Sequence, residues 1–253
     1  MIGEVESPMG IATVITSGKG GVGKSTVAVG IGRALAQRGR RVLLVDCDAG
    51  LRSLDRMTGV EEQLVFDMAD VVCGRCSPAE AIYPCAGEEG LFLLPAPSSS
   101  EGMVSPGVMR KLVPLLTRYY DHVLLDSPAG VGSGFRSAAC GADRALVVCT
   151  PDPVCVRGVG VVTALLDKLG TAQRRLVLNR FSGGLFRSTG AYQDLDAVID
   201  ASGVRLMGLV PEDPALAAAF LGGKRAQESS PGMKALSRVA GRLEGEAIPL
   251  PEL

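Results

Sequence analysis

Short apolar runs alternate along this chain with longer stretches in which apolar positions recur at helical spacing. Seven runs rich in Val, Leu and Ile have the length of strands, at residues 11–16, 41–46, 91–94, 122–126, 144–150, 174–179 and 204–210. These runs are largely continuous in hydrophobicity rather than alternating, which indicates strands covered on both faces. The pattern predicts an α/β fold with a mostly parallel central sheet and helices on both of its faces.

Glycine and proline mark several of the predicted helix boundaries. The stretches VAVGIGRALAQRG and VGVVTALLDKLG end at Gly39 and Gly170, and a glycine there can adopt the left-handed conformation that closes a helix. Ser105 and Pro106 predict a helix start, with the serine as N-cap and the proline in the first turn. Pro114 lies inside that helix, so we expect a kink there or a later start. The stretch PAPSSSEGMVSPG, 95–107, predicts a loop.

Length and composition fit one folded domain of ordinary character. The chain has 253 residues, of which 47% are hydrophobic and 21% charged, and a net charge of -1, without the positive surplus typical of nonspecific nucleic-acid binding. We expect residues 1–10 to form a short disordered lead in which Met9 is an alternative start to Met1. Residues 11–243 would form the domain, and 244–253 an irregular tail. Because the N-terminus MIGEVESPMG is acidic and no run of eighteen apolar residues occurs, we expect neither a signal peptide nor a membrane span, and a cytoplasmic protein whose seven cysteines are reduced.

The stretch SGKGGVGKST, residues 17–26, lies between a predicted strand and a predicted helix. It satisfies the pattern GxxxxGK[ST], which in this context is typical of a phosphate-binding loop (P-loop). Backbone N–H groups of such a loop wrap the β-phosphate at the positive end of the helix. We expect Lys24 to neutralise the β- and γ-phosphates, Ser25 to ligate Mg²⁺, and Thr26 to lie near the α-phosphate. The ATP-binding loop would therefore comprise Gly18, Lys19, Gly20, Gly21, Val22, Gly23, Lys24, Ser25 and Thr26.

Two acids follow apolar runs and are candidates for the chemistry beside this loop. Asp126 closes the strand HVLLD, where a phosphate-loop protein needs an acid to fix magnesium. Asp48 begins the loop after the strand that Asp46 closes, and it would point the same way as Asp46 if the extended conformation persists. A turn or a helix cap is the alternative role for Asp48. No nucleophile with a neighbouring base is evident, and hydrolysis needs none because water attacks the phosphorus.

The extra lysine, Lys19, brings a resemblance to a known family. SGKGGVGKST resembles the deviant Walker A loop of the MinD/ParA ATPases, single-domain P-loop NTPases in which a second lysine precedes the glycine pair. DCDAGLRSLDRMTGVEEQLVFDMADVVCG and DSPAG resemble the switch I and switch II segments of the MinD branch, and LVPED resembles its nucleotide-base loop. The resemblance covers residues 11–243.

This resemblance implies an ATP-hydrolysing, Mg²⁺-dependent dimerisation switch that regulates the placement of the bacterial division site. It implies that Lys19 reaches the phosphates of ATP in the other subunit of a homodimer, that Asp48 orients the attacking water, and that Asp126 holds Mg²⁺ through water. Implied partners are a MinC-like inhibitor and, in some bacteria, a MinE-like stimulator. The residues implied at the adenine are Asn179, Arg180, Pro211, Glu212 and Asp213.

The C-terminal residues depart from the MinD branch, whose members typically end in a basic amphipathic helix that binds the inner membrane. Here the last predicted helix, PGMKALSRVAGRLEG, is interpreted as part of the folded domain with its apolar stripe in the core. A membrane-surface helix is the alternative interpretation. The following GEAIPLPEL contains acids and prolines, so we expect no anchor in it. Contact with the inner face of the membrane, directly or through a partner, stays open.

Two other functional classes are compatible with parts of the sequence. A ParA-like DNA-partitioning ATPase or a flagellar-number regulator would share the phosphate loop, although the charge balance argues against DNA. A metallochaperone or cluster-scaffold ATPase would use Cys73 and Cys76 of CGRC, with Cys85 near them in sequence. A single CxxC is a weak metal signal, because a structural site normally needs four soft ligands. We expect the remaining cysteines to lie in the core, and His122 to have a structural role.

Overall fold

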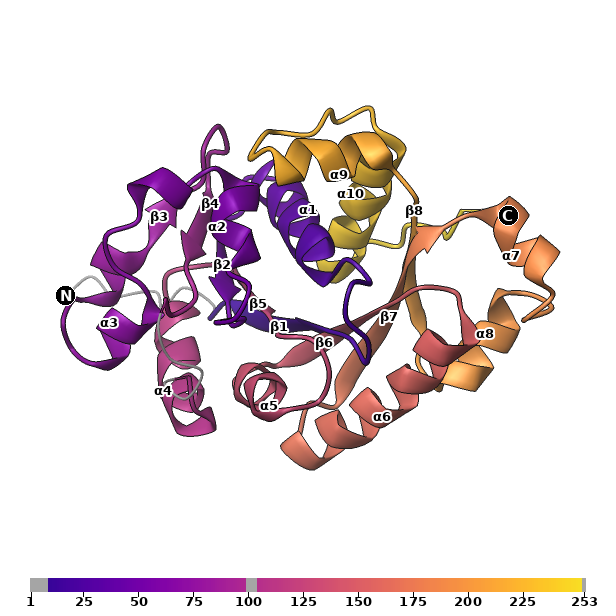
Figure 1. The fold of residues 1–253 in the computed structure, drawn as a ribbon, viewed down its shortest axis with the longest axis horizontal. Helices are drawn as coiled ribbons and strands as arrows, with labels where there is room; N and C mark the ends of the chain where they lie inside the picture. Colours follow the sequence, from indigo (N-terminus) through magenta and orange to yellow (C-terminus); the bar gives the residue numbers. More distant parts are fainter. Residues whose placement is uncertain (1–8, 99–103, 252–253) are drawn as a thin grey trace, which may run out of the picture.

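One eight-stranded sheet forms the centre of the described part of the chain (Figure 1). The computed structural model describes residues 9–98 and 104–251, so residues 1–8 of the lead predicted at 1–10 and the middle of the loop at 95–107 lie outside the described residues. The strand order is β3-β4-β2-β5-β1-β6-β7-β8, and all neighbours are parallel except β3 and β4. The strands are β1 (Ile11–Thr16), β2 (Val42–Asp46), β3 (Tyr83–Pro84), β4 (Leu91–Leu94), β5 (His122–Asp126), β6 (Arg144–Cys149), β7 (Gln173–Phe181) and β8 (Leu206–Pro211).

Helices cover both faces of this sheet, which confirms the predicted fold class. In Figure 1, α1, α9 and α10 lie above the sheet, and α4, α5, α6 and α8 lie below it. The helices are α1 (Lys24–Ala36), α2 (Ser53–Thr58), α3 (Met68–Val72), α4 (Pro106–Leu116), α5 (Ser133–Ala139), α6 (Pro153–Leu169), α7 (Gly183–Thr189), α8 (Leu195–Ser202), α9 (Pro214–Leu221) and α10 (Pro231–Leu243), with short 3-10 turns η1 (Glu61–Gln63) and η2 (Pro78–Ala81).

The predicted helix boundaries agree with the structure in part. Ser105 caps α4 by accepting a hydrogen bond from the Val108 N–H at 3.3 Å, and α6 ends at Gly170, whose φ is 86°. The expected later start of α4 is wrong, because the helix begins at Pro106 and continues through Pro114. The predicted end of α1 at Gly39 is also too late, since the helix ends at Ala36 and Gly39 lies in the following turn.

The short antiparallel strand β3 was not foreseen. It consists of Tyr83 and Pro84 only, paired with β4, and two residues are too few to produce a hydrophobic pattern. Its position is fixed instead by the Tyr83 hydroxyl, which accepts hydrogen bonds from the backbone N–H groups of Val65 and Phe66, both at 2.8 Å. This tertiary contact ties β3 to the segment before α3.

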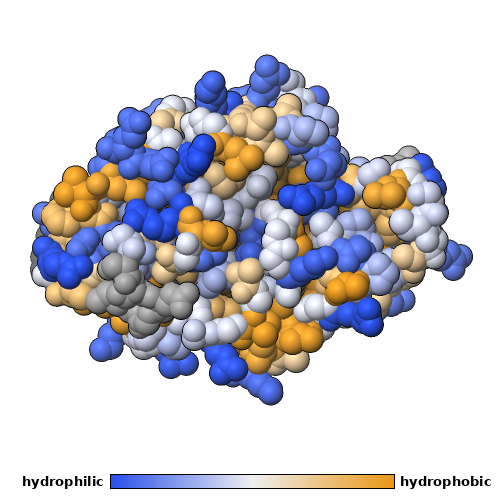
Figure 2. Space-filling model, viewed as in Figure 1, coloured by the Kyte–Doolittle hydropathy of each residue, from blue (hydrophilic) through white to orange (hydrophobic). Residues whose placement is uncertain are grey.

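The last helix, α10, belongs to the folded domain. Its apolar stripe is buried and packs against α1 and β8, so the alternative of a membrane-surface helix is wrong for this segment; the stripe consists of Met233, Leu236, Val239, Ala240 and Leu243. Residues 246–251 have neither helix nor strand. Across residues 9–98 and 104–251, every helix is too short or too polar to cross a bilayer. Figure 2 shows the exposed apolar residues of one face as separate patches among polar ones.

Candidate functional site

The loop of residues 17–23 joins β1 to α1 at the edge where the parallel strands end. Gly23 directly precedes α1 with φ at 89°, and a Cβ there would lie 2.3 Å from the Asn179 amide nitrogen. A Cβ at Gly18 would lie 2.7 Å from the Gly158 carbonyl oxygen in α6. Both positions therefore require glycine, one for its backbone conformation and both for close approach of neighbouring groups.

The start of α1 is open to an anion. No side chain caps it and its first turn contains no acid, so the helix dipole and the first N–H groups have no negatively charged neighbour on the helix itself. Lys24, the first residue of α1, is buried, and its charge acts on Asp126. Such a helix start after a glycine-rich loop is suited to bind phosphate.

A buried carboxyl group stands beside this helix start. Asp126 ends β5 opposite Asp46 of β2, and it is 1% exposed. Burial raises the pKa of Asp126 to about 7, against the opposing effects of a hydrogen bond from Ser25 and of the Lys24 charge. Its Oδ1 atom has no hydrogen-bond partner among the described residues. A carboxylate with a free oxygen and a serine hydroxyl form a donor set that fits Mg²⁺, which binds few protein oxygens and otherwise phosphates and water.

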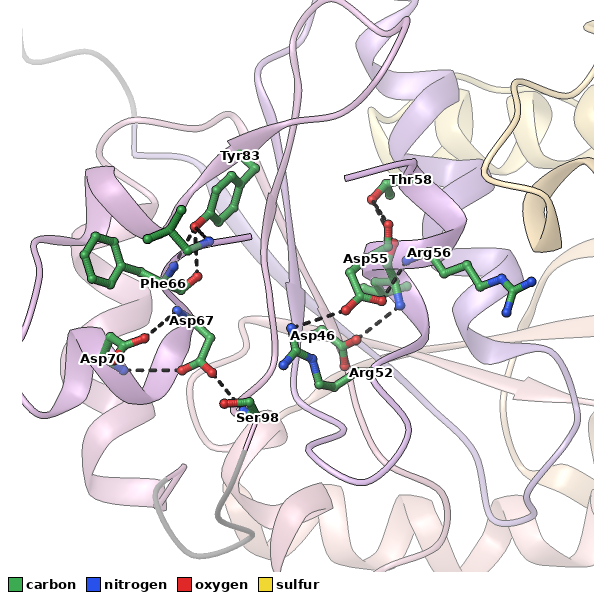
Figure 3. A network of polar contacts seen from close by, with 12 residues as sticks. Asp46, Arg52, Asp55, Arg56, Thr58, Phe66, Asp67, Asp70, Tyr83 and Ser98 are labelled. Atoms are coloured by element: carbon green, nitrogen blue, oxygen red, sulfur yellow. Dashed lines mark hydrogen bonds and ion pairs between the residues drawn. The ribbon is translucent and has the colours of Figure 1, made fainter. Parts of the chain in front are cut away.

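Asp46 organises the loop that carries Asp48, a role that our sequence analysis missed. Its two carboxylate oxygens accept hydrogen bonds from the backbone N–H groups of Asp48, at 2.9 Å, and Leu54, at 3.2 Å. Arg52 in this loop has φ of 44°, and its guanidinium lies 3.3 Å from the Asp55 carboxylate (Figure 3). Burial, followed by the neighbouring Asp126, raises the pKa of Asp46 well above its ordinary value. The sequence signal for this role is that Asp46, like Asp126, ends a predicted strand, and the two residues are opposite each other in neighbouring parallel strands.

Asp48 itself lies at the boundary between this loop and the one after β5. It is half-buried and lines a cavity of about 170 Å³, and its Oδ1 atom accepts a hydrogen bond from the Gly50 N–H at 3.2 Å. Pro128 and Ala129 line the other side of the cavity, just after Asp126 along the chain. The two loops thus enclose a space beside the phosphate loop.

The two lysines of the phosphate loop differ in environment. Lys24 is 8% exposed, whereas Lys19 is exposed and makes no ion pair in the described part of the chain. The Lys19 backbone is restrained, because its carbonyl oxygen accepts a hydrogen bond from the Ser17 hydroxyl at 2.7 Å. One lysine is therefore placed at its own helix start and the other is presented outward.

The residues predicted at the adenine are divided between two locations. Arg180 and Glu212 line a cavity of about 390 Å³ with Leu185 and Phe186, and Arg180 has φ of 53°. Asn179 is buried, and its amide nitrogen donates to the Val22 carbonyl at 2.8 Å, so it holds the phosphate loop.

The other two residues of this predicted set lie at the end of β8 and after it. Pro211 ends β8, and Asp213 caps α9 by accepting from the Leu216 N–H at 3.0 Å. Asp213 also accepts from the Gly232 N–H at 2.9 Å. Neither residue lines the cavity. The two hydrogen bonds to Asp213 give this residue a structural position between α9 and α10.

The cysteines near the CGRC motif and the histidine do not line the cavities described above, whereas Cys47 lines the cavity beside Asp48. Cys73 is exposed, Cys76 half-buried and Cys85 buried, and within the described residues no three His, Cys, Asp or Glu side chains are grouped to hold a metal ion. Of the cysteines expected in the core, Cys140 is only half-buried. The remaining three of that set are buried: Cys47, Cys149 and Cys155. The histidine, His122, is buried at the opposite edge of the sheet, 3.3 Å from Glu244.

Comparisons with known proteins place this geometry among nucleotide-binding proteins. Residues 13–226 match the family described as the CobQ/CobB/MinD/ParA nucleotide binding domain. The septum site-determining protein MinD of Bacillus subtilis (strain 168) is 37% identical over 247 residues, which cover 96% of this chain and 92% of that protein.

Two solved structures are similar to this chain in both sequence and fold. A chain of the MinC:MinD cell division protein complex of Aquifex aeolicus is 35% identical with a TM-score of 0.88, and the match covers 96% of this chain and 99% of that one. The septum site-determining protein MinD of Pyrococcus horikoshii OT3, complexed with Mg-ADP, is 29% identical with a TM-score of 0.83, covering 93% of this chain and 96% of that one.

Proposed function

This chain belongs to the CobQ/CobB/MinD/ParA nucleotide-binding family, and from that premise we propose that it is a MinD-like, Mg²⁺-dependent ATPase that dimerises when it binds ATP. One observation carries the proposal: at a single edge of the sheet, a buried Lys24, the Ser25 hydroxyl and the buried Asp126 converge, while Lys19 faces outward beside them. The first three residues serve the nucleotide of their own subunit. The exposed lysine is available to a second subunit.

ATP would bind along this edge with its phosphates at the start of α1. Lys24 would neutralise the β- and γ-phosphates, and the backbone of residues 18–23 would donate to the β-phosphate. The base would lie in the cavity lined by Arg180 and Glu212. Asn179 would contribute in two ways, because its amide nitrogen already holds Val22 and its amide oxygen is left to accept from the adenine amino group.

Ser25 and Asp126 would hold Mg²⁺, Ser25 directly and Asp126 through a water molecule. Held by these two residues, Mg²⁺ would supply positive charge to the phosphate groups during phosphoryl transfer. The orphaned Oδ1 of Asp126 supports this assignment, since it has no other use among the described residues. Lys24, whose charge lowers the pKa of Asp126, would also help keep that carboxylate ionised.

Asp48 would orient the water that attacks the γ-phosphorus. The backbone of its loop is fixed by two hydrogen bonds to Asp46, and its own carboxylate accepts from the Gly50 N–H, so Asp48 is held in place before the nucleotide arrives. Positioning of this kind is the larger part of phosphoryl-transfer catalysis, because the protein does little covalent chemistry.

Lys19 would act across the dimer interface, on the phosphates of the partner's nucleotide. A cation supplied from outside the subunit stabilises the charge of the transferring phosphoryl group and also makes dimer stability depend on the γ-phosphate. Hydrolysis would remove that dependence and release the dimer, so nucleotide state would control which surfaces are presented to partners.

The cellular role we propose is the placement of the division site. The MinD names of the similar curated proteins support it, and they favour it over a ParA-like or flagellar-number regulator. A MinC-like inhibitor is the proposed partner, since a similar chain comes from a MinC:MinD complex. A MinE-like stimulator and a peripheral position at the inner face of the membrane belong to the same proposal.

Light scattering of the Asp48→Ala protein tests the switch. This variant would bind ATP but not hydrolyse it, so we expect the mass of a dimer with Mg·ATP and of a monomer with Mg·ADP. A protein that remains monomeric with ATP demonstrably bound would contradict the proposal. Pelleting of the trapped dimer with anionic liposomes, against neutral liposomes as control, then tests whether the dimer contacts a membrane by itself.

A further inference from the structure

The first residue of α2 touches the phosphate loop. The Ser53 hydroxyl donates a hydrogen bond to the Ser25 hydroxyl, with 3.1 Å between the two oxygens, although the residues are 28 positions apart in the chain. Ser25 in turn acts on Asp126, because its hydroxyl lowers the pKa of that carboxyl by hydrogen bonding. A chain of three side chains therefore runs from the loop after β2, through the phosphate loop, to the end of β5.

The directions of these hydrogen bonds leave one position on Ser25 free. A serine hydroxyl has one proton and two acceptor lone pairs. The Ser25 hydroxyl uses its proton toward the Asp126 carboxyl, and the Ser53 hydroxyl donates to one lone pair of the Ser25 oxygen. The remaining lone pair of the Ser25 oxygen is the one available to a cation. Ser53 thus removes the rotational freedom that the Ser25 hydroxyl would otherwise have.

The backbone that carries Ser53 is itself fixed on both sides. Arg52 before it is held in the left-handed region and is ion-paired to Asp55, and the N–H of Leu54 after it donates to buried Asp46. The Ser53 hydroxyl is therefore presented from a restrained turn rather than from a mobile loop. Restraint of this kind is what a group needs in order to orient another side chain.

We propose that Ser53 is a positioning residue for the metal ligand Ser25, and that it couples occupancy of the Mg²⁺ site to the start of α2. The inference rests on the proposed function, because it takes Ser25 as a ligand of Mg²⁺. Ser53 does not touch the nucleotide or the reacting atoms in this account. It acts through the orientation of Ser25, so its loss affects the affinity for Mg²⁺ more than the maximal rate.

Calorimetric titration of MgCl₂ into the ADP-bound protein tests the inference without relying on turnover. Loss of one hydrogen bond to a ligand predicts that Ser53→Ala weakens Mg²⁺ binding about fivefold. Ser53→Thr keeps the hydroxyl and should restore affinity to within about twofold of wild type. Ser237→Ala, a half-buried serine in α10, is the matched control and should leave the affinity unchanged.

A double-variant comparison separates orientation from a general effect on folding. In a Ser25→Ala background, Ser53→Ala should have no further effect on Mg²⁺ affinity, because the group that it orients is gone. Equal Mg²⁺ affinities of wild type and Ser53→Ala would overturn the inference and leave the proposed function intact. The same would follow if Ser53→Ala weakened Mg²⁺ binding equally in the wild-type and Ser25→Ala proteins. A wild-type ADP complex that binds no Mg²⁺ would overturn the metal site and this inference together.

Discussion

Buried charged side chains have different surroundings at the two edges of the central sheet, the one where the parallel strands end and the one where they begin. Where the parallel strands end, Asp46 and Asp126 lie side by side in the interior, and an oxygen of Asp126 is unsatisfied among the described residues. Where the strands begin, the charged side chains contact an opposite charge or polar oxygens, although Nδ1 of His122 and Nη2 of Arg144 have no hydrogen-bond partner among the described residues. Glu244 accepts from Arg40 at 2.7 Å and lies 3.3 Å from His122.

Arg242 shows the second pattern most clearly. Its guanidinium donates to the carbonyls of Met207, Ile248 and Pro249 at 2.7, 2.9 and 2.6 Å, and so holds the segment after α10 onto the domain. Unsatisfied buried charge destabilises a fold and is retained where a ligand will use it, whereas satisfied charge adds stability. We therefore interpret one edge as organised for the proposed phosphate and cation, and the other as holding the chain together.

Lys24→Ala should produce the largest change and should act on binding alone. Without the cation at the start of α1, we expect ATP affinity to fall by about a thousandfold, or about 4 kcal/mol. The free energy of unfolding of the nucleotide-free protein should not decrease, because a buried lysine charge is unfavourable when no phosphate is bound to it. Equilibrium binding of a fluorescent ATP analogue and thermal unfolding measure the two quantities. A variant that loses stability but keeps its affinity would reverse the comparison.

Asp126→Asn tests the electrostatic condition of the same edge. Because the folded pKa is about 7 and the ordinary value 3.8, the folded protein binds the proton more tightly than the unfolded chain does. The free energy of unfolding of the metal-free protein should therefore fall as pH rises between about 4 and about 7, by a few kcal/mol from this group. The Asn variant should lose that part of the dependence and be the more stable protein at about pH 8.

Urea unfolding in EDTA without nucleotide, at about pH 5 and about pH 8, measures this difference. Asp46 is buried beside Asp126 and is retained in the variant, so some pH dependence should remain. A wild-type protein whose stability rises between the two pH values, with an unchanged slope in Asp126→Asn, would contradict this description of the edge.

Arg242→Met should act on stability alone. It removes charged hydrogen bonds to three carbonyls but keeps much of the aliphatic contact, so we expect a loss of about 2 kcal/mol in the free energy of unfolding. The Michaelis constant for ATP should not change, since the proposed nucleotide site lies at the other edge. Chemical denaturation and steady-state kinetics provide the two readouts, and a changed Michaelis constant with unchanged stability would count against the comparison.

Arg38→Ala should have the smallest effect. Arg38 pairs with Glu246 on the surface, where screening and side-chain entropy offset most of the attraction. A loss below about 1 kcal/mol is expected, and it should shrink further in high salt. Denaturation at low and high NaCl checks this. A larger, salt-independent loss would mean that the segment after α10 is held by this pair rather than by Arg242.

Much of the site was predictable because it depends on short-range patterns. The loop from Gly18 to Ser25 has its own spacing rule, and the acid after a strand follows from the geometry of parallel sheets. Asp46 was within reach of the same reasoning, since it ends β2 directly opposite Asp126. The family resemblance assigns a role to Asp48, two residues later, and none to Asp46.

Other features depend on the path of the chain in space and leave no local pattern. Ser53 meets Ser25 only because the loop after β2 returns to the phosphate loop. Arg33 is 1% exposed in α1, where its guanidinium donates to the carbonyls of Lys224 and Met57. A single arginine in an apolar helix does not reveal partners that lie 24 and 191 positions away. Asn179 was expected at the adenine, and its contact with Val22 was equally invisible in the sequence.

The central claim is that Lys19 serves the nucleotide of the partner subunit, and complementation between two inactive variants tests it most directly. Lys19→Ala and Asp48→Ala should each hydrolyse ATP poorly alone. In an equal mixture, a mixed dimer has one site with Asp48 from one subunit and Lys19 from the other, so about a quarter of the wild-type rate should return. If Lys19 acted within its own subunit, every site in the mixture would lack one of the two groups. Activity that stays at the level of the separate variants, with mixed dimers shown to form, would contradict the account.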